Sequence, residues 1–260
     1  ILAQNAMIQK KTTAAILYET NSDLVIENLN LAAPGPKEVF VQMGAAGVCH
    51  SDVHVISGQA QQLMPCVLGH EGAGLVTAIG DQVSRVSVGD HVILSWLPYC
   101  EKCYQCIRGK THLCKAFQTP VGNGTLLDGS CRFSNKHGPI RQLGSLGCWS
   151  ENVVVSEECC VPINRSIPFE IAALLGCAVT TGVGAVLNRA KVQKGETVVV
   201  IGAGGVGLSV VMAAKLQGAS QIICIDRNRS MRNLAIELGA TDFLVTSQDD
   251  DTSKKLIELT

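Results

Sequence analysis

The chain has 260 residues, of which 47% are hydrophobic and 17% are charged, and its formal net charge is −1. This composition is typical of a globular protein with enough apolar material for one large or two ordinary domains. The near-neutral charge argues against a nucleic-acid-binding surface, which needs a basic patch. Twelve cysteines, in a sequence without a recognisable secretion signal, predict a reducing, cytoplasmic location in which thiols bind metal rather than form disulfides.

Short β-like segments, separated by Gly, Pro and Asp turns, make up the chain to about residue 165. The clearest of them are Thr13–Tyr18, Val39–Met43, Gly74–Ile79, His91–Leu94 and Asn152–Val155. This pattern predicts a β-rich, barrel-like domain.

A helical stretch from Pro168 to Leu187 follows. After it, predicted strands alternate with predicted helices. The predicted strands are Thr197–Ile201, Gln221–Asp226 and Phe243–Thr246, and the helices between them are Val206–Gln217 and Ser230–Leu238. Such alternation predicts a parallel sheet of the doubly wound type. The uncharged run Thr197–Ala214 is nearly long enough to cross a membrane, but its glycine-rich centre favours a strand, a turn and a helix, so we expect no membrane partner.

Four cysteines lie on one short polar segment in the spacing C-x2-C-x2-C-x7-C: Cys100, Cys103, Cys106 and Cys114. Four thiolates so close together can surround one tetrahedral Zn²⁺ and leave no position open for chemistry. The main alternative is an iron–sulfur cluster, but the bacterial ferredoxin pattern needs a shorter last gap and a following proline, whereas Lys115 follows here. The sequence therefore predicts a structural zinc site in a loop over residues 98–116.

A second motif, G-x-G-x-x-G, begins at Gly202 and includes Gly204, Gly205, Val206 and Gly207. It follows a predicted strand, opens a predicted helix, and is followed by Asp226 at the end of the next strand. In this context the glycines let the backbone approach a pyrophosphate at the helix N-terminus, and the carboxylate binds the adenosine ribose. A carboxylate there favours NAD over NADP, although Arg227 and Arg229 lie close by.

Two further segments, Cys49-His-Ser-Asp-Val-His54 and Gly69-His-Glu71, carry metal-ligand side chains, and Cys177 stands alone. A lone His or Cys is more often a buried structural residue than a ligand. A Cys, a His and a later Cys would instead give Zn²⁺ three protein ligands and one open position, which is the arrangement of a catalytic site. Spacing by itself leaves the convergence of these residues open.

Together these motifs resemble the zinc-containing alcohol dehydrogenases of the medium-chain dehydrogenase/reductase superfamily. The resemblance rests on C-H-S-D-x-H, G-H-E-G-A-G, the four-cysteine loop, L-G-C and G-x-G-G-V-G, and covers residues 12–260. It implies a GroES-like catalytic domain over residues 12–178 and a partial Rossmann domain over residues 179–260. It also implies two zinc ions and NAD as cofactors, with a primary alcohol or aldehyde as substrate.

The resemblance implies a role for each matching residue. Cys49, His70 and Cys177 would hold a catalytic zinc, with Asp52 and Glu71 as carboxylates beside it; Asp52 would orient the His70 imidazole. Ser51 would take the alcohol proton and pass it through the coenzyme ribose to His54. The remaining matches are coenzyme and substrate contacts: His50 at a phosphate, Thr181 and Val206 at the nicotinamide, and Trp96 in the substrate channel, which its indole would narrow.

Several alternatives stay open at this point. The stretch Asp128–Phe133 is similar to the glutathione-dependent formaldehyde dehydrogenases, but the arginine expected after Cys114 for a glutathione carboxylate is absent. A catalytically silent zinc- and nucleotide-binding protein is a third hypothesis. The identity of the alcohol and the direction of the reaction are not determined by the sequence.

The two ends of the chain differ in pattern from the rest of the sequence. Residues 1–6 read as upstream sequence without a structural role, and the run Asp249–Asp251 opens a helical pattern that does not finish. Because family members are longer, we expect a C-terminally truncated fragment that is itself weak or inactive, whereas the full-length protein would be a homodimer or homotetramer.

Overall fold

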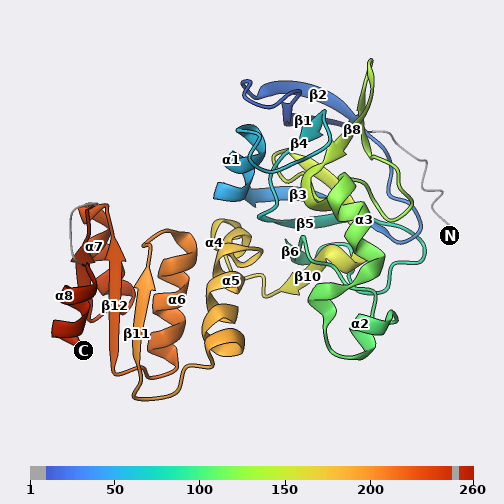
Figure 1. Ribbon diagram of the computed structural model, residues 1–260. Helices are drawn as coiled ribbons and strands as arrows, with labels where there is room; N and C mark the ends of the chain where they lie inside the picture. Colours follow the sequence, from blue (N-terminus) through green and yellow to red (C-terminus); the bar gives the residue numbers. More distant parts are fainter. Residues whose placement is uncertain (1–9, 248–251) are drawn as a thin grey trace. The chain divides into compact units, whose positions relative to one another are not determined.

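The computed structural model describes residues 10–247 and 252–260, so the expectations for residues 1–6 and 249–251 lie outside the described residues. The chain divides into two compact units, Ile1–Cys177 and Ala178–Thr260. Figure 1 shows the strands of the first unit in blue to yellow and the smaller sheet of the second unit in orange. Each unit is described by itself.

The first unit contains a closed five-stranded barrel. Its strands follow one another around the barrel in the order β1 (Lys10–Leu17), β2 (Val25–Leu31), β7 (Phe133–Asn135), β8 (Gly138–Gln142) and β4 (Cys66–Val67). Antiparallel pairing of β1 with β4 closes the ring. Along β1 the side chains alternate between buried and partly exposed positions, because successive residues of a strand point to opposite faces. The predicted β-rich barrel is confirmed.

A second sheet of five strands lies in the same unit. Its order is β10 (Cys160–Ile163), β6 (His91–Leu94), β5 (Gly72–Ile79), β3 (Glu38–Ala46) and β9 (Asn152–Ser156). One core serves both sheets: Ile16, Leu31 and Phe133 of the barrel belong to the same buried cluster as Val41 and Val154 of the second sheet. Since these side chains are fully excluded from water, they supply a large part of the apolar burial that holds the unit together.

Four helices complete the first unit: α1 (His50–Ile56), α2 (Tyr104–Ile107), α3 (Lys115–Asn123) and α4 (Phe169–Leu175). Helix α3 was not predicted from the sequence, because Pro120 and Gly122 are poor helix formers. Burial of Phe117, which is 3% exposed, against the four-cysteine segment outweighs that local preference. The β7–β8 hairpin was also missed, since its strands are too short to give a clear alternation.

The second unit is a three-stranded parallel sheet in the order β11 (Thr197–Ile201), β12 (Gln221–Asp226) and β13 (Asp242–Val245). Its helices are α5 (Ala178–Gly184), which continues as a π-helical turn over Ala185–Ala190, α6 (Gly205–Leu216), α7 (Arg232–Leu238) and α8 (Thr252–Leu259). Val200, Leu208 and Phe243 form part of its buried core. The predicted alternation of parallel strands and helices is confirmed.

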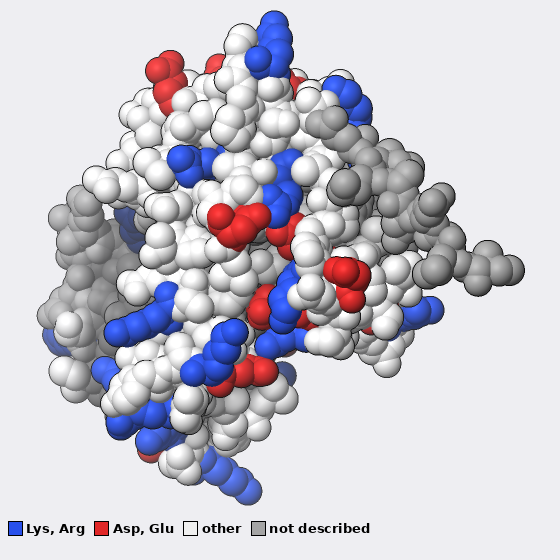
Figure 2. Space-filling model, turned by 90° about the vertical axis from the view of Figure 1, so that its right-hand side faces the viewer, with Lys and Arg blue, Asp and Glu red and all other residues white. Residues whose placement is uncertain are grey.

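No single helix among the described residues is long and apolar enough to cross a membrane, although the bent pair formed by α4 and residues 178–190 passes by length and composition. Figure 2 shows a face on which uncharged residues cover most of the surface, and basic and acidic side chains alternate over its centre. No broad field of one sign therefore lies over the centre of this face.

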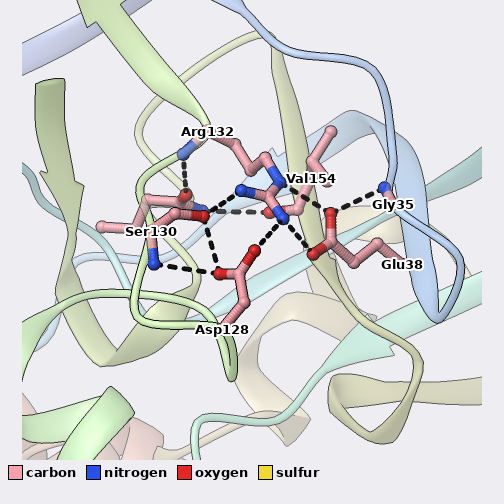
Figure 3. A network of polar contacts seen from close by, with 7 residues as sticks. Gly35, Glu38, Asp128, Ser130, Arg132 and Val154 are labelled. Carbon is pink, nitrogen blue, oxygen red and sulfur yellow. Dashed lines mark hydrogen bonds and ion pairs between the residues drawn. The ribbon is translucent and has the colours of Figure 1, made fainter.

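A buried ion pair joins the barrel to the second sheet. The Arg132 guanidinium at the edge of β7 contacts both oxygens of Glu38 at the start of β3, with Nε 2.7 Å from Glu38 Oε2. Asp128 Oδ2 lies 2.8 Å from Arg132 Nη2, and Glu38 Oε2 also accepts the Gly35 N–H at 2.9 Å. Figure 3 shows the guanidinium between the two carboxylates, so this network ties three loops together in one place.

Candidate metal centres and dinucleotide turn

The four cysteines of the polar segment converge on one point. The Sγ atoms of Cys100, Cys103, Cys106 and Cys114 lie within 4.8 Å of one another, and three of the pairs are 3.5 to 4.0 Å apart. Four sulfurs held at about 2.3 Å around one tetrahedral zinc lie about 3.8 Å apart. All four are free thiols, and these distances are far too long for disulfides. In a four-iron cluster each thiolate binds a different iron, so the single-ion geometry fits zinc better.

Nearby backbone N–H groups lower the pKa of two of these thiols. Backbone N–H groups of Cys106 and Lys115 lower the pKa of Cys103 to about 6, because they stabilise its thiolate. The pKa of Cys100 is also lowered, chiefly by the Lys102 N–H. Burial and the neighbouring sulfurs raise the pKa of Cys106 to about 12. A divalent cation would stabilise all four thiolates at once, so the donor set fits a structural zinc.

A second group of donors forms where α1, the β4–β5 connection and the end of α4 meet. Ligand atoms of Cys49, His70, Glu71 and Cys177 lie within 4.8 Å of one another. Cys49 precedes α1 as its N-cap residue, His70 and Glu71 come just before β5, and Cys177 follows α4. The fold thus brings together Cys49, His70 and Cys177, which only the family resemblance had grouped. The Glu71 carboxylate lies in the same group.

Asp52 holds this group in place. Its side chain is fully buried, its Oδ2 accepts the Cys49 N–H at 3.1 Å, and its Oδ1 accepts the Gly69 N–H at 3.0 Å. The same Oδ1 lies 3.2 Å from His70 Nδ1. A proton on Nδ1 would therefore be donated to Asp52, which leaves Nε2 of His70 for a metal.

The electrostatics of the group favour positive charge. Burial lowers the pKa of His70, but hydrogen bonds and charge from Asp52 and Cys177 outweigh it and raise that pKa to about 11. Burial raises the pKa of Cys49, but hydrogen bonds from the Ser51 amide, the Ser51 hydroxyl and His70 lower it overall. The raised pKa of His70 and the lowered pKa of Cys49 show that the group stabilises a positive charge next to a thiolate. Zn²⁺ would supply that charge once the proton on His70 Nε2 is released, so the residues present fit this ion.

Glu71 reaches the group past a glycine. A Cβ placed on Gly47 would lie 2.2 Å from Glu71 Oε2, so a larger residue there would displace this carboxylate. The Gly47 N–H donates to the Glu71 backbone carbonyl at 2.8 Å, which fixes the two segments side by side. Glu71 was predicted as a carboxylate beside the metal, and one of its oxygens lies within 4.8 Å of the ligand atoms of the other three residues.

A cavity of about 210 Å³ opens beside these donors. Its walls are Ser51, Val55, Ala60, Gln61, His70, Trp96, Val121, Leu143 and Gly144. The Trp96 indole lies edge-on to the His70 ring, with 6.1 Å between ring centroids. Trp96 and Val121 also line a neighbouring cavity of about 420 Å³, which reaches to His112 and Lys115 on the four-cysteine segment. The indole therefore stands between two cavities.

The glycine motif forms the turn between β11 and α6. Gly202 has φ of +100°, and its N–H donates to the Ile225 carbonyl at 2.8 Å. A Cβ on Gly207 would lie 1.8 Å from the Gly202 carbonyl oxygen, so this position requires glycine. Helix α6 thus begins directly at the turn, and its N-cap residue Gly204 provides no side-chain cap, so the first N–H groups of the helix can bind an anion.

Asp226, at the end of β12, is bound to the same turn. Its Oδ2 accepts the Ala203 N–H at 2.6 Å and its Oδ1 accepts the Asn228 N–H at 2.7 Å. These bonds lower the pKa of Asp226, with the Ala203 amide as the largest cause. The carboxylate therefore stays ionised and fixed in orientation beside the glycines.

The remaining predicted residues lie on helices. Thr181 is on α5 and Val206 on α6, and the two helices touch where a Cβ on Gly182 would lie 2.7 Å from the Val206 carbonyl oxygen. Ser51 and His54 lie three residues apart on α1, and Ser51 Oγ is 3.6 Å from Cys49 Sγ. His50 and His54 contact each other with ring centroids 4.8 Å apart.

The cavity walls were only partly anticipated. Ser51, His70 and Trp96 were predicted as site residues, whereas the apolar residues Val55, Val121 and Leu143 were not. Val121 and Leu143 come from α3 and from the turn after β8, which carry no motif. No sequence signal distinguishes such wall residues from ordinary core positions.

Comparisons with known proteins agree with this architecture. Residues 35–165 match the family model "Alcohol dehydrogenase GroES-like domain", and residues 205–260 match the model "Zinc-binding dehydrogenase". The chain therefore belongs to the zinc-containing alcohol dehydrogenases of the medium-chain dehydrogenase/reductase superfamily, and the resemblance drawn from its motifs is confirmed.

Particular relatives are similar over almost the whole chain. The S-(hydroxymethyl)glutathione dehydrogenase of Saccharomyces cerevisiae is 44% identical over 256 residues, covering 96% of this chain and 66% of that protein. Two crystal structures are each 34% identical: an alcohol dehydrogenase zinc-binding domain protein from Burkholderia ambifaria (TM-score 0.90, 97% of this chain and 68% of that one) and benzyl alcohol dehydrogenase from Acinetobacter calcoaceticus (TM-score 0.88, 96% and 68%). The chain spans about two thirds of the length of the curated relatives it matches.

Proposed function

We propose that the protein is a zinc-dependent, NAD-dependent alcohol dehydrogenase that transfers hydride between a primary alcohol and NAD. One observation carries this proposal: the ligand atoms of Cys49, His70, Glu71 and Cys177 converge beside a cavity that also exposes Ser51. A donor set of this kind beside an open cavity is typical of catalytic zinc, whereas the four-cysteine group is closed and structural.

In this proposal Cys49, His70 and Cys177 hold the catalytic zinc, and Cys100, Cys103, Cys106 and Cys114 hold the structural one. When bound, the catalytic zinc supplies Lewis-acid polarisation of the substrate oxygen. Asp52 keeps the His70 ring in the ligating orientation through its contact with Nδ1. Glu71 is close enough to act as a further ligand while no substrate fills the cavity.

Ser51 is the proposed proton acceptor. Its hydroxyl lines the cavity beside His70, so an alcohol in the cavity can donate its proton to Ser51 Oγ while Ser51 passes its own hydroxyl proton through the coenzyme ribose toward His54. His54 follows three residues later on the same helix face and is the proposed base at the surface end of the relay. Because Ser51 is held beside the cavity, removal of the alcohol proton requires no base from solvent.

The coenzyme would bind at the turn of the second unit. The proposed contacts are Gly202, Gly204, Gly205 and Gly207 at the pyrophosphate, Asp226 at the ribose hydroxyls, Thr181 and Val206 at the nicotinamide, and His50 at a phosphate. Asp226 is ionised and held by two backbone amides, so it accepts hydrogen bonds from a ribose and repels a 2′-phosphate. This supports NAD over NADP.

The cavity supports an uncharged substrate. Apart from the ligand His70, its wall contains no acidic or basic side chain among the described residues, and Val55, Trp96, Val121 and Leu143 make most of it apolar. A charged substrate would lose hydration there without gaining a partner. We propose a small apolar primary alcohol, or the matching aldehyde, as the substrate.

A glutathione-dependent formaldehyde dehydrogenase is the second candidate, since a 44% identical relative carries that name. The larger cavity beyond Trp96 contains Lys115 and His112, where a carboxylate of the tripeptide could be bound. The expected arginine is absent, and among the described residues that line this cavity Lys115 is the only permanent cation for two carboxylates. Stimulation of formaldehyde oxidation by glutathione, abolished by Lys115→Gln, would move this candidate to first place.

Elemental analysis of the purified chain tests the metal part. We expect two zinc ions per chain, with one lost in Cys49→Ser and a different one lost in Cys103→Ser. A single zinc that survives Cys49→Ser would favour the silent zinc-binding protein instead.

Alcohol oxidation tests the chemical part. In the whole protein, NAD reduction should depend on a primary alcohol, and Ser51→Ala should lower kcat by about 100-fold or more while zinc content and NAD binding stay unchanged. Unchanged turnover in that variant would overturn the relay. A homodimer or homotetramer in the cytoplasm remains our expectation for the whole protein.

A further inference from the structure

Helix α1 carries two histidines, His50 and His54, at the spacing i, i+4. Residues four apart on a helix lie one turn above each other on the same face, with their Cβ atoms about 5 to 6 Å apart. This is the spacing with which the H-E-x-x-H helix of zinc proteases places two imidazoles on one ion. The sequence H-S-D-V-H has the same spacing, and neither histidine belongs to the ligand sets above.

The side chains already lie together. The two rings are in edge-on contact, with centroids 4.8 Å apart and planes at 81°. No hydrogen bond or ion pair joins either ring to another residue of the described chain, whereas His70 is bound on both sides. His50 is exposed and His54 is half-buried, so both can be reached from solvent. Two free imidazoles in contact at a water-accessible place form a ready chelating pair.

We propose that His50 and His54 form a third metal site, which takes a divalent transition ion such as Zn²⁺ or Ni²⁺. Imidazole nitrogen is a preferred ligand of both ions, and small rotations of the two side chains can direct one nitrogen of each ring at a common point. Water completes the coordination, because no carboxylate or thiol of the described residues joins the pair. Binding is accordingly weaker than at the two cysteine-containing sites and is reversible.

The site has a consequence that rests on the proposed function. His54 is the proposed surface base of the relay, and a metal ion on its nitrogen occupies the lone pair that would accept the proton. His50 is the proposed phosphate contact of the coenzyme, and its nitrogen would be occupied by the same ion. Divalent metal in excess of the two zinc ions is therefore an inhibitor that acts through α1.

The test is a calorimetric titration of Ni²⁺ into the chain with both cysteine-containing sites filled by zinc. We expect one Ni²⁺ per chain without release of zinc. His50→Gln and His54→Gln should each weaken this binding by about tenfold or more, because the second imidazole binds intramolecularly. His137→Gln, an exposed histidine on the β7–β8 hairpin, is the matched control and should bind as the parent does.

Zinc content and the thermal unfolding midpoint are measured in every variant, so that loss of binding is not mistaken for misfolding. Ni²⁺ binding that persists in both histidine variants, that needs only one of the two histidines, or that releases an equal amount of zinc would overturn the proposal. The titration needs no turnover, so a protein without alcohol dehydrogenase activity would refute the proposed function and leave this result standing. In an active protein, inhibition should appear over the concentrations at which Ni²⁺ binds and be reversed by a weak chelator.

Discussion

Asp52 Oδ1 lies 3.2 Å from His70 Nδ1, and both side chains are almost completely buried. The same carboxylate accepts hydrogen bonds from the backbone N–H groups of Cys49 and Gly69. One side chain thus fixes the orientation of the imidazole and the positions of two segments that carry metal donors. These contacts hold the segments that carry Cys49 and His70 next to each other.

Replacing the Asp52 carboxylate should weaken zinc binding at the proposed catalytic site and leave zinc binding at the four-cysteine site unchanged. In Asp52→Asn the charge that stabilises a cation at His70 is gone, and we expect zinc affinity at this site to fall by about 10- to 100-fold. The four-cysteine site shares no residue with it and should keep its zinc. Competition with a chromogenic chelator, which resolves the two ions by affinity, measures the effect.

The matched control for that experiment is Asp81→Asn, which removes an exposed carboxylate in the loop after β5. It should leave both affinities unchanged. Equal zinc affinity in Asp52→Asn and in the parent would show that Asp52 does not act through His70.

Trp96 should set the size of the accepted alcohol. Its indole stands between the cavity of about 210 Å³ beside the metal donors and the one of about 420 Å³ beyond it. In Trp96→Ala the two should join, and kcat/KM for a bulky aromatic alcohol relative to ethanol should rise by about tenfold or more. Leu97→Ala is the control, since Leu97 lines only the larger cavity. An unchanged ratio would mean that the indole does not limit the substrate.

The buried pair Arg132–Glu38 should contribute to stability through its coupling. The side chains are 13% and 11% exposed, so removing Arg132 leaves the Glu38 carboxylate buried without a cation. We expect Arg132→Met to destabilise the protein by about 3 kcal/mol, and the double variant with Glu38→Gln to cost less than the two single changes added together. Urea unfolding of the four proteins gives the coupling energy, with Lys136→Met as an exposed control. Simple additivity would argue against the pair.

Asp128 should give the same network a dependence on pH. Burial raises its pKa, but the Ser130 hydroxyl and the Arg132 guanidinium outweigh it and lower the pKa from 3.8 to about 2. Because the folded pKa lies below the unfolded one, the stabilisation is complete above about pH 4 and is lost as the pH falls toward 2. Asp128 is 53% exposed, so we expect solvent screening to limit the effect to about 1 kcal/mol or less.

Urea unfolding of the parent and of Asp128→Asn across this pH range checks that sign. The stability difference should be largest near pH 5 and shrink on acidification. A difference that grows as the pH falls would mean that another group, and not Asp128, is responsible.

Much of the secondary structure was predictable because local pattern and tertiary packing agree. Strand β12 lies where the alternation of strands and helices predicts it, and the turn before α6 lies where the glycine motif predicts it. Helix α3 was not predictable, because its proline and glycine oppose helix formation and only the burial of Phe117 outweighs them. Local propensity is a weak determinant wherever packing against distant residues supplies more free energy.

The sequence by itself determined the four-cysteine site and the glycine turn, because in both the functional atoms come from residues close together in the chain. Short spacing fixes their geometry once a loop or a strand–helix turn forms. Only the tertiary structure decided that Cys49, His70, Glu71 and Cys177 share one point, since they lie on separate elements joined by the barrel and the second sheet. It also decided the apolar walls around Trp96, because such residues have no chemistry of their own and acquire a role only from what the fold places beside them.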